Sequence, residues 1–170
     1  MYLRILGALL VCAGGGGMGM RIAWGYRQEE RMLTMLLQAL DTMVCQLRYR
    51  MTALPELCDL ASGVCSGALR HFFGALAWQL SLCVETDAAT CVTLALETTS
   101  GLPAAVERNL RLLGVNLGRF DAQGQLSGLQ SVMELAQRDL DGLRAMLHHR
   151  LRACRTLGFC AGAALAILLL

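Results

Sequence analysis

Residues 121–170 read DAQGQLSGLQSVMELAQRDLDGLRAMLHHRLRACRTLGFCAGAALAILLL. The first part of this segment has an apolar side chain every three or four residues, the period of an amphipathic helix: Leu126, Leu129, Met133, Leu140, Leu143, Leu147 and Leu151. Residues 156–170 carry no charge at all. We therefore expect one unbroken helix of about 75 Å, amphipathic where it begins and wholly apolar where it ends.

The opposite end of the chain has the same apolar character. Residues 5–20 carry no charge, and every acidic residue and every basic residue except Arg4 lies between the two apolar runs. A membrane-spanning helix needs about 20 apolar residues, or about 30 Å. The first run supplies about 24 Å, or about 33 Å if the helix continues to residue 26, and the second supplies about 22 Å. We expect transmembrane helices over residues 1–26 and 156–170; the alternative for each is a buried core helix.

Arginines flank the two apolar runs mainly on their inner sides. Arg21, Arg27 and Arg31 follow the first run, and further arginines between residues 144 and 155 precede the second. Positively charged segments next to membrane spans stay in the cytoplasm. The distribution therefore predicts a cytoplasmic middle domain over residues 27–155, with both termini outside the cytoplasm.

Glycines recur within both apolar ends. Gly15 and Gly19, like Gly158 and Gly162, are four residues apart, a spacing that lets two helices approach closely in lipid. Residues 14–19 also satisfy the GxGxxG pattern of dinucleotide-binding folds. That fingerprint requires a strand–helix–strand unit, whereas the residues that follow have helical periodicity. Helix packing in the membrane is therefore the favoured interpretation.

In the middle of the chain, apolar residues recur every three or four positions, as in helices, and not every second position, as in strands. We expect helices over residues 28–51, 52–63, 69–84, 87–99, 103–118 and from 121 onward. Thr52 is a predicted N-cap, and Gly101 and Gly118 are predicted stops. Because the connections are short, neighbouring helices should be antiparallel. The predicted fold class is all-α: an antiparallel helical bundle domain with an N-terminal and a C-terminal transmembrane helix.

No set of residues indicates catalysis or a bound group. His148 and His149 are adjacent and point about 100° apart on a helix, so they cannot hold one metal ion together. Asp139 and Asp141 face different sides of their helix, and the glycine run lacks the Lys and Ser/Thr of a phosphate loop. The net charge of +2 is too small to indicate nucleic acid. We expect no enzymatic activity, no cofactor, no metal and no nucleic-acid partner.

The cysteines bear on the cellular compartment. None of the eight forms a CxxC pair, and those of the middle domain lie among Leu and Ala. We expect them to be small buried hydrophobic residues in a reducing compartment. The alternative is an exported helical domain behind a signal peptide, with disulfides. Arg4 and the apolar run after it fit a signal peptide loosely, but the heavier positive charge beyond that run argues against export.

Three motifs occur in order along the chain. Residues 113–125 (LGVNLGRFDAQGQ) fit LGxxLGxxDxxxQ, and residues 36–56 and 157–170 supply the other two. Together they resemble the stage III sporulation protein AB family of endospore-forming bacteria. Two positions depart from the family pattern: Ala53 stands where Pro is usual, and Gln46 stands where Glu is common.

The resemblance implies a function that spacing and composition do not show. Such proteins belong to an operon whose products build a channel between mother cell and forespore, and they are distantly similar to the platform proteins of type II secretion. The implied location is the mother-cell membrane facing the forespore. The implied role is a non-enzymatic platform that contacts membrane lipid, other channel proteins and a secretion-type ATPase of the same operon. Motif membership alone makes five residues candidates for partner contact or for a structural role: Tyr49, Thr52, Gly118, Asp121 and Gln125.

Overall fold

The structure of this chain is a computed structural model. It describes the backbone of residues 2–82, 87–117 and 122–169, and the side chains of residues 24–82, 87–117 and 123–146. Every regular element within these residues is an α-helix, and no strand occurs among them. The all-α prediction is therefore confirmed. The dinucleotide-binding alternative is wrong, because residues 14–19 lie inside a helix and not at a strand–helix turn.

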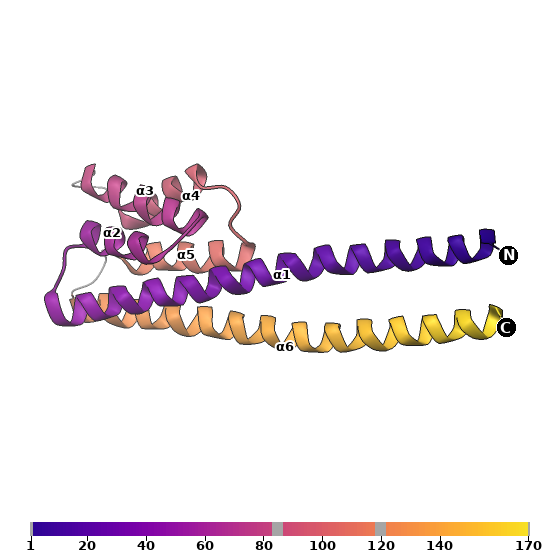
Figure 1. Ribbon diagram of the computed structural model, residues 1–170. Helices are drawn as coiled ribbons and strands as arrows, with labels where there is room; N and C mark the ends of the chain where they lie inside the picture. Colours follow the sequence, from indigo (N-terminus) through magenta and orange to yellow (C-terminus); the bar gives the residue numbers. More distant parts are fainter. Residues whose placement is uncertain (1, 83–86, 118–121, 170) are drawn as a thin grey trace. The chain divides into compact units, whose positions relative to one another are not determined.

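The chain divides into two compact units, each described here by itself. One combines residues 1–30 with residues 141–170, and the other is residues 31–140, which we call the helical domain. Two long helices, α1 (Tyr2–Arg50) and α6 (Ala122–Leu169), each contribute to both units (Figure 1).

Four shorter helices complete the helical domain: α2 (Leu54–Val64), α3 (Ala68–Leu82), α4 (Ala88–Thr98) and α5 (Ala104–Asn116). The predicted cap at Thr52 is wrong. Met51 has a positive φ of 49°, the chain stays non-helical through Ala53, and Ala53 is the N-cap of α2 without a side-chain cap bond. Gly101, with φ 84°, follows α4 as predicted.

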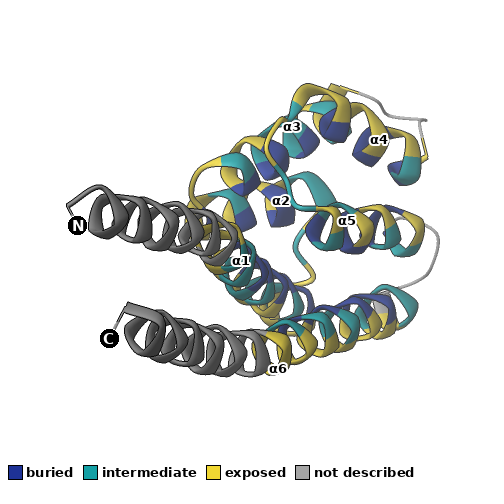
Figure 2. Cartoon of the chain, turned by 90° about the vertical axis from the view of Figure 1, so that its right-hand side faces the viewer, coloured by how far each residue is buried: buried dark blue, intermediate teal, exposed yellow. Residues whose placement is uncertain are grey.

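The short helices pack in the order in which they occur along the chain. Contacts join α2 to α3, α3 to α4 and α4 to α5, with the buried faces drawn in dark blue in Figure 2. Phe72 and Phe73 on α3 are both fully buried, and their rings meet edge to face with centroids 5.3 Å apart. This geometry suits the charge distribution of aromatic rings and adds to their burial energy.

Glycine permits two close approaches between helices of this domain. A Cβ atom on Gly114 of α5 would lie 2.8 Å from the Cβ of Val92 on α4. A Cβ on Gly128 of α6 would lie 2.8 Å from the Cβ of Asn116 on α5. Both distances are shorter than real Cβ contacts, so a larger residue at either position would push two helices apart.

The domain portions of α1 and α6 bury the apolar stripes that their sequences predict. Met32, Leu36, Met43 and Leu47 of α1 and Leu129 and Leu140 of α6 are buried. The remaining stripe positions with described side chains, Met35, Leu126, Met133 and Leu143, are partly exposed. Of the predicted α6 stripe, two of the described positions are thus buried and three are partly exposed.

The unit formed by the two helix ends has one described ion pair between α1 and α6. Arg144 Nε donates a hydrogen bond to Glu30 Oε1 at 2.8 Å. Among the residues whose side chains are described, no helix is both long enough and apolar enough to cross a membrane. The predicted spans over residues 1–26 and 156–170 fall almost wholly on residues whose side chains lie outside the described part. The same holds for Gly15, Gly19, Gly158 and Gly162.

Candidate interaction surface

A cluster of polar side chains joins α5 to α6 inside the helical domain. Arg108 Nη2 donates to both carboxylate oxygens of Asp139 at 2.8 Å. Asn109 Nδ2 donates to Asp139 Oδ2 at 2.7 Å and to the Ala105 carbonyl at 2.8 Å. Asp139 therefore receives charge-assisted hydrogen bonds from two neighbouring residues of one helix, which are among the stronger hydrogen bonds in proteins.

Burial makes this cluster favour one particular pairing of α5 with α6. Asn109 is fully buried, and its Oδ1 atom has no hydrogen-bond partner among the described residues. An amide buried in this way costs free energy in any helix pairing that does not present Asp139 to it. We interpret the cluster as the contact that sets the register of α5 against α6.

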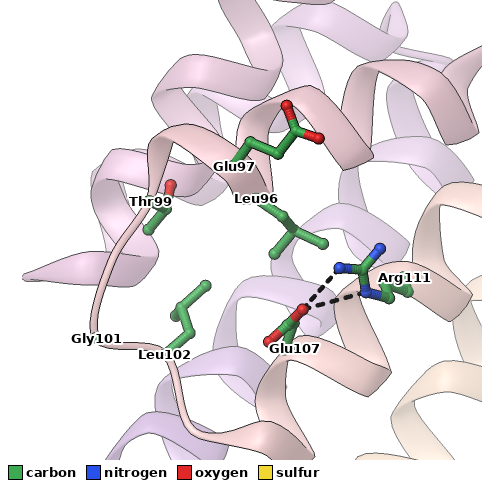
Figure 3. A pocket seen from close by; sticks show the side chains of 7 residues that line it. All are labelled: Leu96, Glu97, Thr99, Gly101, Leu102, Glu107 and Arg111. Carbon is green, nitrogen blue, oxygen red and sulfur yellow. Dashed lines mark hydrogen bonds and ion pairs between the residues drawn. The ribbon is translucent and has the colours of Figure 1, made fainter.

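A shallow hollow of about 290 Å³ lies between the end of α4 and α5 (Figure 3). Glu107 Oε1 accepts hydrogen bonds from Arg111 Nη2 at 2.7 Å and Nε at 3.2 Å along one wall. Both side chains are substantially exposed, so this pair adds little to stability. The hollow contains no buried titratable group, and we assign no ligand to it.

The described cysteines fall into two environments. Cys58, Cys65 and Cys91 are buried, as predicted, whereas Cys45 on α1 is exposed, and the prediction of burial is wrong there. Desolvation raises the pKa of Cys58 to about 12 and that of Cys65 to about 11. Both thiols therefore stay neutral at ordinary pH and serve as small apolar side chains. No cluster of three or more metal-ligating side chains occurs among the described residues.

The end of α1 carries the most exposed large apolar side chains of the described residues. Tyr49 is 77% exposed and Met51 is 79% exposed. Arg48 and Arg50 on either side are exposed as well. We call these four consecutive residues, 48–51, the α1 corner. Tyr, Arg and Met are the residue types enriched where proteins bind one another.

The sequence-predicted site residues separate into three groups. Tyr49 belongs to the α1 corner, and Thr52 lies partly buried in the connection that follows it. Gln125 lies partly buried in the first turn of α6, and Figure 1 shows that α6 begins at the end of the helical domain where α1 ends. Gly118 and Asp121 lie outside the described residues. Tyr49 and Thr52 are thus near one another because they are three positions apart in the sequence, and the 113–125 motif stays a predicted site.

Sequence reasoning missed two groups of residues. Arg48, Arg50 and Met51 were not singled out, although an uninterrupted Arg-Tyr-Arg-Met run is visible in the sequence. Asn109 follows Val106 at helical spacing on an otherwise apolar face, which marks it as a buried polar residue. Its pairing with Asp139, 30 positions later, has no local signal.

The fold places this chain in a class of proteins with an all-helical domain, whose first and last helices extend into apolar terminal segments. The chain belongs to the stage III sporulation protein AB family, whose family model matches residues 4–170. A solved structure, described as stage III sporulation protein AB (SpoIIIAB), is similar with a TM-score of 0.62 and 18% sequence identity. The similarity covers 71% of this chain and 97% of that one, and at this identity it concerns the fold alone. No match was found among curated proteins.

Proposed function

We propose that this sporulation protein is a non-enzymatic membrane platform in the channel complex between mother cell and forespore. The single observation that carries the proposal is the family match over residues 4–170, because it spans both apolar ends as well as the helical domain. The proposed location is the mother-cell membrane that faces the forespore.

The two apolar ends support the membrane part of the proposal. Residues 5–20 and 156–170 carry no charge, and they lie on α1 and α6, which continue without interruption into the helical domain. A helix satisfies its own backbone hydrogen bonds, as a segment in lipid must. In this arrangement the helical domain lies in the cytoplasm, and both termini lie outside it.

The helical domain is the proposed binding partner of a cytosolic secretion-type ATPase of the same operon, and of other channel proteins. The exposed α1 corner supports a binding role, because exposed aromatic and Met side chains flanked by arginines are typical of interfaces. Motion of the ATPase would then reach the membrane through α1 and α6.

Site-resolved thiol labelling tests on which side of the membrane the helical domain lies. The cells express the protein without sporulating, because the outer face of its membrane is then open to the medium. Cys45 is the suitable reporter, because it is exposed on the helical domain. A membrane-impermeant maleimide should leave Cys45 unlabelled in intact cells and label it after permeabilisation, as read by mass spectrometry of the peptide. A Tyr2→Cys variant provides the control and should be labelled in intact cells. Labelling of Cys45 in intact cells would instead place the helical domain outside the cytoplasm, as the exported alternative requires.

A pull-down in membranes tests the partner. The full-length protein in nanodiscs should retain the purified ATPase of the operon, and empty nanodiscs should not. Failure of the wild-type protein to retain the ATPase under any nucleotide condition would overturn the platform role.

A further inference from the structure

The α1 corner combines three independent observations. The first is exposure, since Tyr49 and Met51 are the two most exposed large apolar side chains among the described residues. A folded domain normally leaves such side chains exposed singly, and here only one residue separates the two. Packing within the helical domain gives no reason for these two apolar side chains, because neither is buried in it.

The second observation is backbone strain. Met51 has a φ of 49°, and among the described residues no other residue except glycine has a positive φ. Glycine is the usual residue at this position after a helix, because a Cβ atom is unfavourable in the left-handed region. Here a long flexible side chain occupies a position where glycine would stabilise the turn. Strain of this kind concentrates at functional sites.

The third observation is charge. No acidic residue lies between Asp41 and Glu56 in the sequence, whereas Arg48 and Arg50 do. Neither arginine forms an ion pair with a described residue. Because successive helical residues point about 100° apart, Arg48 and Arg50 leave the helix on either side of Tyr49. They are therefore placed to hold carboxylates on both sides of an aromatic ring.

We propose that the α1 corner binds an acidic segment of a soluble protein. Carboxylates of that segment pair with Arg48 and Arg50, and an apolar side chain packs on Tyr49 and Met51. The inference deepens the proposed function, because it requires the proposed cytosolic ATPase to carry this segment. Arginine favours this partner because its planar guanidinium binds a carboxylate through two hydrogen bonds.

Position along α1 favours a protein over the membrane surface. The proposed transmembrane helix over residues 1–26 precedes the helical domain, which begins at Arg31. Tyr49 lies about 27 Å further along α1 than Arg31. Lipid headgroups attract arginines only within about one Debye length, roughly 8 Å at physiological salt. An anionic membrane remains a distinct outcome of the test.

The experiment uses the full-length protein in nanodiscs and two binding partners. One is a short labelled peptide of repeated Glu-Leu-Glu-Ala, with a Gln-for-Glu peptide as its uncharged counterpart; the other is the ATPase. The variants are Arg48→Glu with Arg50→Glu, Tyr49→Ser and Met51→Gly. Arg70→Glu and Trp78→Ser are matched controls, because they change an exposed arginine and an exposed aromatic ring on α3. Thermal unfolding monitored by circular dichroism verifies that each variant folds.

The expected result is selective loss at the α1 corner. The wild type binds the acidic peptide, does not bind the Gln peptide, and binds more weakly as salt rises. The double charge reversal lowers affinity for peptide and ATPase by at least about tenfold, and Tyr49→Ser and Met51→Gly by about fivefold. The α3 controls keep wild-type affinity. Loss in Met51→Gly without loss of thermal stability separates binding from folding.

Other outcomes overturn the inference in distinguishable ways. If the wild type and the corner variants hold the ATPase equally well, the inference fails and the proposed function stands. If the wild type itself does not hold the ATPase, the proposed function fails and the inference fails with it. If the corner variants lose only binding to vesicles rich in phosphatidylglycerol, the corner is a lipid contact. If they change only the oligomeric state, it joins copies of this chain.

Discussion

Met51 occupies a backbone conformation that favours a different residue. A side chain at φ 49° costs about 1–2 kcal/mol relative to glycine, part of which is offset by the greater freedom of glycine in the unfolded chain. Met51→Gly should therefore raise the free energy of unfolding by about 0.5–1 kcal/mol, measured by urea denaturation. Trp78→Gly is the control, because it places glycine inside α3 and should lower stability. Destabilisation by Met51→Gly would mean that the methionine side chain packs against the domain.

Asp139 is the residue on which the α5–α6 contact depends most. Asp139→Ala removes the hydrogen bonds from Arg108 and Asn109 and leaves the buried Asn109 amide with its Ala105 bond alone. The free energy of unfolding should fall by about 2–3 kcal/mol. Glu134→Ala on the same helix is the control, since its 3.7 Å ion pair with Arg138 is exposed and should contribute below about 0.5 kcal/mol. If both variants lowered the free energy of unfolding equally, the cluster would not stabilise the contact between α5 and α6.

Cys58 makes the helical domain sensitive to alkaline pH. Burial raises its pKa from 9.0 to about 12, so the folded state keeps the proton that the unfolded state releases. Its contribution to stability is complete below pH 9 and is lost as the pH rises from about 9 towards 12. Cys58→Ala should make the free energy of unfolding fall less steeply over this window than in the wild type. Parallel pH profiles would show that the thiol is not desolvated.

The contact between α4 and α5 depends on a residue without a side chain. Gly114→Ala places a methyl group 2.8 Å from the Val92 Cβ, which cannot move without its helix, so stability should fall by about 1–3 kcal/mol. Gly74→Ala on α3 is the matched control, because its added Cβ meets nothing within 4 Å. Helix propensity should make that variant more stable by about 0.5–1 kcal/mol. Thermal unfolding of the two variants gives shifts of opposite sign if the packing is as described.

The proposed anchoring of the whole chain can be tested by truncation. Removing either residues 1–26 or residues 156–170 should leave the protein in the membrane pellet, because the remaining apolar helix still partitions into lipid. Removing both should release the helical domain into the soluble fraction after a carbonate wash. A doubly truncated protein that stays in the pellet would show that the domain itself binds the membrane.

Much of this architecture is encoded locally and can be predicted from the sequence. The helical period of Leu36 and Met43, or of Val106, Leu110 and Leu113, identifies helices and their buried faces, because residues three or four apart share one side of a helix. Order along the chain and short connections then indicate which helices are neighbours. The family resemblance rests on the same local information.

Contacts between residues distant in the sequence could not be predicted locally and are set by the tertiary structure. The pairing of Asn109 with Asp139 and the fit of Gly114 against Val92 depend on how helices meet in space, and no periodicity within one helix encodes that. Exposure has the same origin. Cys45 is expected in the core from the sequence, yet it faces solvent because no other element covers that side of α1 within the described domain. A side chain's chemistry is local, but whether a neighbour buries it is a property of the assembled helices.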